Sequence, residues 1–249
     1  MIRILLVVEG EKTEVDVFKE LFTILGFSVV QEPKRGNFSR YTISTADKLV
    51  YLIPGPKQQV LEIMKEFDSA SMDLSLFFNI PEPIALNYIV YDADDTIFAD
   101  FSSLIENFKS SQDGLILLSN PCFEVLADNV YDTHHKAPKY YKKKVRQQLI
   151  STGSINPGTT LLQYMVNNII KLLIEQVRRN EVFFNSSDIY NHAIDSYNLI
   201  SSNVIDRTLN IYTYSNLFSV IYVILGDIFE VSKYENNTQK LITKLTGFL

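Results

Sequence analysis

An apolar run ends in a cluster of aspartates in the stretch "NYIVYDADDTIF", residues 87–98. Asp92, Asp94 and Asp95 fall within four residues of one another. Like charges this close repel, and each raises the pKa of the others. A divalent cation would remove that cost, and hard cations such as Mg²⁺ prefer carboxylate oxygens. The stretch therefore indicates a metal site. Two other interpretations are open: an aspartyl nucleophile, or a cap on a following helix, whose N-terminus favours acidic side chains.

A second acidic segment, "VVEGEKTEVDVF" at residues 7–18, begins directly after an apolar run. Glu9 follows the five apolar residues Ile4–Val8, and Glu14 comes early in a helical pattern. A glutamate-rich turn before a helix is one sufficient explanation, because acidic groups favour helix N-termini. The place of Glu9 at the end of a strand makes it a candidate site residue as well.

Three short apolar runs predict the strands that would position these carboxylates. They are "IRILLVV" at 2–8, "NYIVY" at 87–91 and "GLILLS" at 114–119. Helical patterns follow them at 13–25, 96–111 and from 120 onward, with Thr13 expected to cap the first helix and Gly26 to end it. Alternating strands and helices predict an α/β fold with a mainly parallel sheet flanked by helices. Ligands bind beyond the carboxyl ends of such strands, so Glu9, Asp92 and Asn120 are expected at one rim.

The remaining segments are predicted with less detail. Residues 33–40 form a basic turn region, 40–44 and 48–53 are candidate strands, and a helix begins at Pro56. After residue 150 the pattern becomes helical, at 156–180, 186–202, 216–234 and 238–249. We expect two domains, a catalytic domain at 1–150 and a helical domain at 151–249.

The totals of this 249-residue chain describe an acidic protein with a formal net charge of −6. That balance argues against indiscriminate coating of DNA, which depends on neutralising phosphates. The single Cys122 excludes an internal disulfide and fits a reducing, cytoplasmic setting. The N-terminus lacks a signal-peptide pattern, and no apolar stretch reaches the length of a membrane span, so no membrane association is expected.

One dense basic segment stands out in this acidic chain, "HHKAPKYYKKKVRQQ" at 134–148. Lysines bind phosphate, and tyrosines such as Tyr140 and Tyr141 can stack on unpaired bases. The segment is a candidate nucleic-acid contact and equally a candidate for a solvated helix face. Its basic residues are Lys136, Lys139, Lys142, Lys143, Lys144 and Arg146.

The aspartate cluster resembles the D-x-D-x-T motif of HAD-superfamily phosphatases, in which the first aspartate is the nucleophile. Asp92, Asp94 and Thr96 fit that motif, and "ILLSN" resembles the second motif, with Ser119 in place. "GDIFE" at 226–230 is a loose echo of the acidic motif. The position departs from the family, because a full strand and helix precede Asp92.

Taken together, the ordered motifs look like a Toprim domain, in which a strand, a Glu–Gly turn and a helix precede a strand ending in D-x-D. "VEGEKTE" at 8–14 is similar to the opening motif of RloB-like Toprim proteins, and "SNPCFE" at 119–124 matches the motif they carry after the D-x-D strand. The resemblance covers residues 4–124, about half of the chain.

This resemblance implies a Rossmann-like Toprim fold and an OLD-type, metal-dependent nuclease acting on DNA or on RNA, with tRNA among the candidate substrates. Glu9, Asp92 and Asp94 would be catalytic and bind Mg²⁺ or Mn²⁺. Asp95 and Glu14 would be further ligands, with Glu124 and Asn120 in support.

The same resemblance implies an abortive-infection effector in bacterial anti-phage defence. It also implies a separate SMC- or ABC-like ATPase partner, since the chain has no P-loop motif, and a homodimer as one possible assembly. A HAD-like phosphatase, and a non-catalytic Toprim-fold subunit that binds nucleic acid, are the alternatives.

Overall fold

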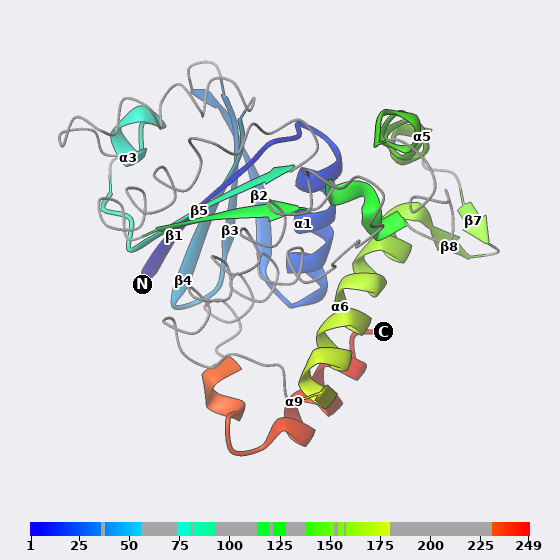
Figure 1. Ribbon diagram of the computed structural model, residues 1–249. Helices are drawn as coiled ribbons and strands as arrows, with labels where there is room; N and C mark the ends of the chain where they lie inside the picture. Colours follow the sequence, from blue (N-terminus) through cyan, green and yellow to red (C-terminus); the bar gives the residue numbers. More distant parts are fainter. Residues whose placement is uncertain are drawn as a thin grey trace, which may run out of the picture. The chain divides into compact units, whose positions relative to one another are not determined.

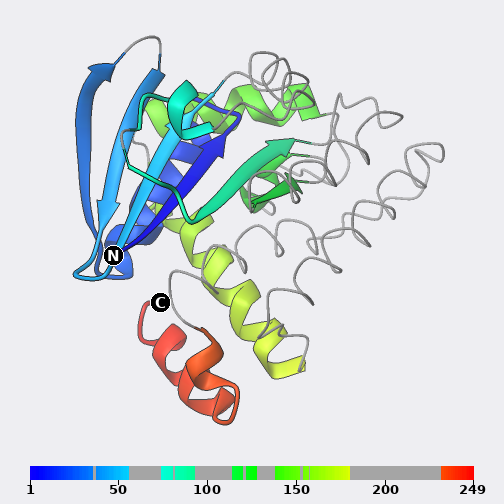
Figure 2. The ribbon, with the colours of Figure 1, turned by 90° about the vertical axis from the view of Figure 1, so that its left-hand side faces the viewer.

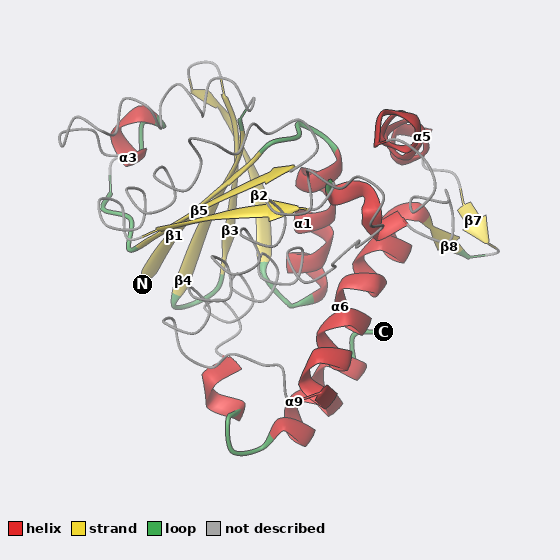
Figure 3. Ribbon diagram, in the orientation of Figure 1, coloured by secondary structure: helices red, strands yellow, loops and turns green. Residues whose placement is uncertain are grey.

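The computed structural model describes ten stretches of the chain, and the helices and strands discussed below lie within them (Figures 1 and 3). These residues are 1–35, 38–55, 74–80, 82–92, 114–119, 122–127, 138–151, 154–156, 158–179 and 231–249. The chain divides into two units, Met1–Leu117 and Leu118–Leu249. The predicted division between residues 150 and 151 stays a prediction. Each unit is described by itself.

A six-stranded sheet organises the first unit, in the order β2-β3-β4-β1-β5-β6, and the last two residues of β6 belong to the second unit. The central β1 runs parallel to both of its neighbours, β4 and β5. Together with its helices, the sheet confirms the predicted α/β fold. The strands are β1 (Ile2–Val8), β2 (Ser28–Arg35), β3 (Phe38–Ser44), β4 (Lys48–Pro54), β5 (Leu86–Asp92) and β6 (Gly114–Ser119).

The sheet is mixed rather than parallel throughout, because β2, β3 and β4 form an antiparallel meander (Figure 2). Only a few residues separate these strands, whereas a parallel pair needs a crossover of a dozen or more. The basic turn predicted at residues 33–40 was therefore placed too broadly: β2 runs on through Arg35, and β3 begins at Phe38. Glu32 pairs in register with Arg40, whose Nε donates to it at 2.7 Å. This cross-strand contact keeps a charge-rich segment extended.

The strand β1 is the most deeply buried part of this unit. Its residues Ile4–Val8 are at most 1% exposed, as the continuous apolar run predicts for a strand covered on both faces. Helix α1 (Thr13–Ile24) packs against β2 and β4 (Figure 1). It buries Phe18 and Phe22, whose ring centroids lie 6.3 Å apart. Truncating either ring to alanine would cost about 3–5 kcal/mol of stability.

The two ends of α1 differ in how well the sequence predicts them. Gly26 ends the helix as expected, with φ +88°, and the amides of Gly26 and Phe27 donate to the carbonyls of Thr23 and Phe22. The expected cap by Thr13 was wrong. Thr13 is the first helical residue, and the preceding Lys12 makes no side-chain cap but pairs with Asp16. Acidic groups in the first turn stabilise this end instead.

The second unit is built on α6 (Leu161–Arg179), which contacts α5 (Pro138–Ser151), α9 (Thr238–Thr246) and the 3₁₀ helix η2 (Phe123–Ala127). Both ribbon views place α6 and α9 side by side (Figures 1 and 2). A continuous helical stripe of α6 is buried. It consists of Leu161, Met165, Val166, Ile169, Ile170, Leu173, Ile174 and Val177.

The sequence predicts α6 and α9 correctly but misses a small hairpin before α6. That hairpin pairs β7 (Ser154–Asn156) with β8 (Thr159–Thr160), and Gly158 takes φ +86° in its turn. The remaining described elements are the short α3 (Leu74–Phe77) and η3 (Val231–Tyr234). The helices predicted at 56–67, 96–111 and 186–202 lie outside the described residues. Of the helix predicted at 216–234, only the end is described, and it is the 3₁₀ helix η3. Of the helices that are described, none combines the length and apolar character needed to span a bilayer.

A buried tyrosine joins β4 to the segment before β5. The Tyr51 hydroxyl donates to Glu82 Oε2 at 2.7 Å, and the Arg40 guanidinium lies 5.5 Å from the Tyr51 ring centroid. Burial, and next the Glu82 carboxylate, raise the pKa of Tyr51 to about 12. Since the folded-state pKa lies above the ordinary value of 10.0, the associated stability is complete below pH 10 and is lost as pH rises toward 12.

Replacing Tyr51 by Phe should cost about 0.5–1.5 kcal/mol near neutral pH, because the bond to Glu82 is lost. The difference between wild type and Tyr51→Phe should shrink as the pH is raised from 9 toward 12. Denaturant unfolding across that range measures it, with Tyr41→Phe on the neighbouring strand as the control. A difference that is constant with pH would contradict the account.

Candidate functional site

Two carboxylate residues meet at the carboxyl ends of neighbouring parallel strands. Asp92 is the last residue of β5, and Glu9 directly follows β1. The Glu9 amide donates to the Val90 carbonyl at 3.1 Å, and the Asp92 amide donates to Glu9 Oε2 at 2.8 Å. The structure thus brings Glu9 and Asp92 together at one rim, as the strand ends predict.

The surroundings of this pair are largely closed to solvent. Asp92 is only 4% exposed, and Glu9 is half-buried. Burial, and next the negative charge of Glu9, raise the pKa of the Tyr91 hydroxyl well above its ordinary value. The Glu9 carboxylate therefore bonds to the Asp92 amide, and its charge acts on the neighbouring Tyr91 phenol. A cation would bind strongly here, because a nearby positive charge stabilises buried carboxylates more than exposed ones.

Glu14 closes the turn between β1 and α1. Its carboxylate accepts a hydrogen bond from the Gly10 amide at 3.1 Å, and the side chain is only 4% exposed. A Cβ on Gly10 would lie 2.0 Å from Glu14 Oε2, so any other residue there would displace the carboxylate that folds back onto the turn. The predicted role of Glu14 as a metal ligand stays a prediction, and the contact observed is with the turn.

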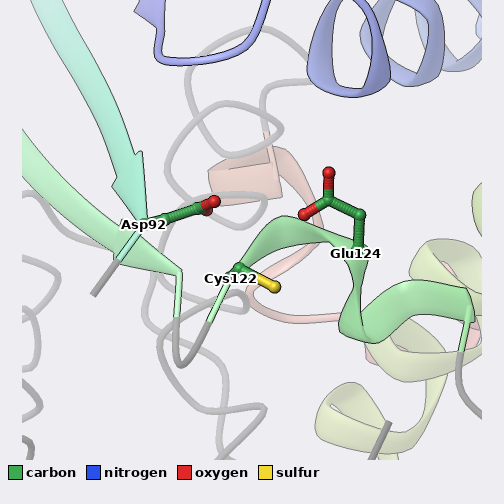
Figure 4. Close-up of side chains that lie close together, drawn as sticks. All are labelled: Asp92, Cys122 and Glu124. Atoms are coloured by element: carbon green, nitrogen blue, oxygen red, sulfur yellow. The ribbon is translucent and has the colours of Figure 1, made fainter. Parts of the chain in front are cut away.

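The second unit holds the residues of the "SNPCFE" motif that the structure describes. Ser119 ends β6, Cys122 precedes η2, and Glu124 lies within η2. All three are buried, and within the part of the chain that the structure describes neither Ser119 Oγ nor Glu124 Oε2 has a hydrogen-bond partner. The Cys122 sulfur and a Glu124 carboxylate oxygen lie within 4.8 Å of each other. Figure 4 draws these two side chains and Asp92 on their elements.

A thiol beside a carboxylate is a donor set that borderline metals such as Zn²⁺ accept, and carboxylates alone suit Mg²⁺. The sequence identifies Glu124 as a candidate but not its proximity to Cys122. The sequence shows only that Cys122 and Glu124 are two positions apart. That spacing puts two side chains on one face of a strand but not on one face of a helix.

Four predicted site residues lie outside the described residues: Asp94, Asp95, Asn120 and Lys136. Lys139 lies in α5, but its side chain is not described.

The rest of the basic segment forms one side of α5. Lys143, Lys144 and Arg146 are exposed, whereas Val145 and Leu149 on the same helix are buried. Lys142 is half-buried. The helix therefore presents three cations to solvent, an arrangement that both a phosphate contact and an ordinary solvated face would produce.

No family model and no curated protein matches the chain. Among solved structures, it is similar to the hypothetical protein PH0156 from Pyrococcus horikoshii OT3, with a TM-score of 0.37 and 14% identity. The match covers 91% of this chain and 100% of the other. A similarity this low carries no information about function.

Replacing Gly10 by Ala should displace the Glu14 carboxylate and destabilise the protein by roughly 1–2 kcal/mol. Gly10 has no positive φ, so the clash with Glu14 decides the cost, not the backbone. In a Glu14→Ala background the same change should cost little. Thermal unfolding of the wild type, both single variants and the double variant measures the coupling. Equal costs of Gly10→Ala in both backgrounds would refute this role of Glu14.

Proposed function

We propose that this protein is a metal-dependent phosphodiesterase, a nuclease of the Toprim type that acts on DNA or RNA. The observation that carries the proposal is the contact between Glu9 and Asp92 at the carboxyl ends of β1 and β5. The motifs that resemble RloB-like Toprim proteins assign these same two positions to the metal site. Contact between residues 83 positions apart supports that assignment.

The residues at the rim fit a hard cation. Glu9 and Asp92 offer carboxylate oxygens from two adjacent strands, which is the donor type that Mg²⁺ and Mn²⁺ prefer. When bound, such an ion lowers the pKa of an attacking water and offsets the charge that develops on the phosphate. Asp92 would bind the ion together with Asp94. Glu9 would be a further ligand or would take the proton from the water, held in place by the Asp92 amide.

A HAD-like phosphatase is the main competing function, with Asp92 as nucleophile. In that mechanism Glu9 has no chemical role. The hydrogen bond between the Asp92 amide and Glu9 favours the Toprim assignment, because it makes Glu9 part of the same site. A non-catalytic subunit that binds nucleic acid would need neither carboxylate.

The setting of the activity is proposed from the resemblance alone. We propose a cytoplasmic effector of bacterial anti-phage defence, working with a separate SMC- or ABC-like ATPase.

Changing Glu9 to Gln should lower nuclease activity by a factor of about 10² to 10⁴, the usual range for losing a general base or a comparable group. Glutamine keeps an oxygen for the Asp92 amide, so the variant should fold as the wild type does. Asp92→Asn should be equally inactive. The assay uses plasmid DNA and total RNA with Mg²⁺ or Mn²⁺, with and without any SMC- or ABC-like ATPase that a neighbouring gene encodes.

A generic phosphomonoester and a phosphoenzyme trap complete that experiment. Full activity of Glu9→Gln on every substrate would defeat the nuclease proposal even if Asp92→Asn were inactive. A phosphoenzyme formed on Asp92 would establish the phosphatase instead.

The exposed cations of α5 should contribute to nucleic-acid binding. Replacing Lys143, Lys144 and Arg146 together by Ala should weaken binding and flatten the dependence of log K on log salt by up to about two to three units, because fewer counterions are released.

Lys171→Ala/Arg178→Ala/Arg179→Ala removes the same charge from exposed positions of α6 and is the matched control. If both triple variants bind with the same affinity and salt dependence, α5 is an ordinary solvated helix.

A further inference from the structure

No described residue forms a hydrogen bond with the buried hydroxyl of Tyr91. Tyr91 is 0% exposed, next to Asp92 on β5, and its Oη is left unpaired. An unsatisfied buried hydroxyl is costly, and phenylalanine would fill the same space without that cost. Such a group in a native protein needs a reason.

The register of the sheet places this hydroxyl on the Glu9 side. Val8 of β1 pairs with Val90 of β5, and the Glu9 amide continues the ladder by donating to the Val90 carbonyl at 3.1 Å. The next position along the two strands therefore sets Glu9 beside Tyr91. Side chains at facing positions of neighbouring strands share one face of a sheet. The effect of the Glu9 charge on the Tyr91 phenol agrees with that placement.

Glu9 can accept more than one hydrogen bond. A carboxylate has about four lone-pair positions, enough for the Asp92 amide, a cation and a phenol. A buried phenol is a donor with a fixed direction, because packing on all sides holds its ring.

We propose that Tyr91 is the positioning residue of Glu9: its hydroxyl donates a hydrogen bond to the Glu9 carboxylate when that carboxylate binds the cation. This rests on the proposed metal site. Groups that orient a metal ligand commonly change affinity by about 10- to 100-fold when removed. The Asp92 amide and the Tyr91 hydroxyl would then hold one carboxylate from two sides.

Mn²⁺ binding measured by calorimetry tests the proposal on wild type, Tyr91→Phe, Glu9→Gln, the double variant and Asp92→Asn. Tyr91→Phe should weaken binding about 10-fold, while the metal-free protein remains at least as stable as the wild type. In the Glu9→Gln background the Tyr91 change should add nothing. Tyr88→Phe, which removes another buried phenol from β5, should leave Mn²⁺ affinity unchanged.

A second readout does not depend on affinity. In protein labelled with ¹³C at the tyrosine ζ carbon, the Tyr91 resonance, assigned with Tyr91→Phe, should shift when Mg²⁺ is added and should not shift in Glu9→Gln.

The outcomes separate the two proposals. Wild-type affinity in Tyr91→Phe, with binding lost in Glu9→Gln and Asp92→Asn, overturns the role of Tyr91 and leaves the metal site standing. Wild-type protein that binds no Mn²⁺, or Asp92→Asn that binds it equally well, overturns both.

Discussion

The hydrogen bond from the Asp92 amide to the Glu9 carboxylate ties together the ends of two parallel strands. It forms because β1 and β5 are neighbours in register, so that the residue after Val8 reaches the end of β5. That register depends in turn on the burial of Ile4–Val8, which fixes β1 at the centre of the sheet. The Glu9 carboxylate is thereby held at the end of β5, against the backbone of a second acidic residue, Asp92. A divalent cation bound by both side chains would offset their charges.

Two further features support the same end of β1. Glu14 folds back onto the Gly10 amide, so the chain leaves the strand in a turn tied to the first turn of α1. Tyr91 occupies the register position beside Glu9, and its buried hydroxyl bonds to none of the described residues. The first of these holds the backbone at Glu9. Packing does not explain the Tyr91 hydroxyl, because a buried hydroxyl without a hydrogen bond costs stability. Features that cost stability without a structural return are found most often at functional sites.

The central strands and the rim could be predicted from sequence because burial leaves a direct trace in apolar runs. The spacing in α6 and the glycine that ends α1 are equally local signals. The antiparallel meander was harder to predict, because "EPKR" becomes strand through the contact of Glu32 with Arg40 and Thr42, residues of the next strand. The prediction that Thr13 caps α1 was wrong because Thr13 is the first residue of the helix itself. The acidic residues of the first turn stabilise the exposed amides there. The unpaired state of Tyr91 and the proximity of Cys122 to Glu124 depend on tertiary packing, which no local pattern records.

The central claim is that Glu9 and Asp92 bind one divalent cation. The most direct test is an anomalous difference map from crystals of the protein soaked in Mn²⁺. The account predicts a peak bonded to carboxylate oxygens of both residues, and its loss in Asp92→Asn crystals. A map without a peak at the ends of β1 and β5, or a peak there that persists in Asp92→Asn, would contradict it.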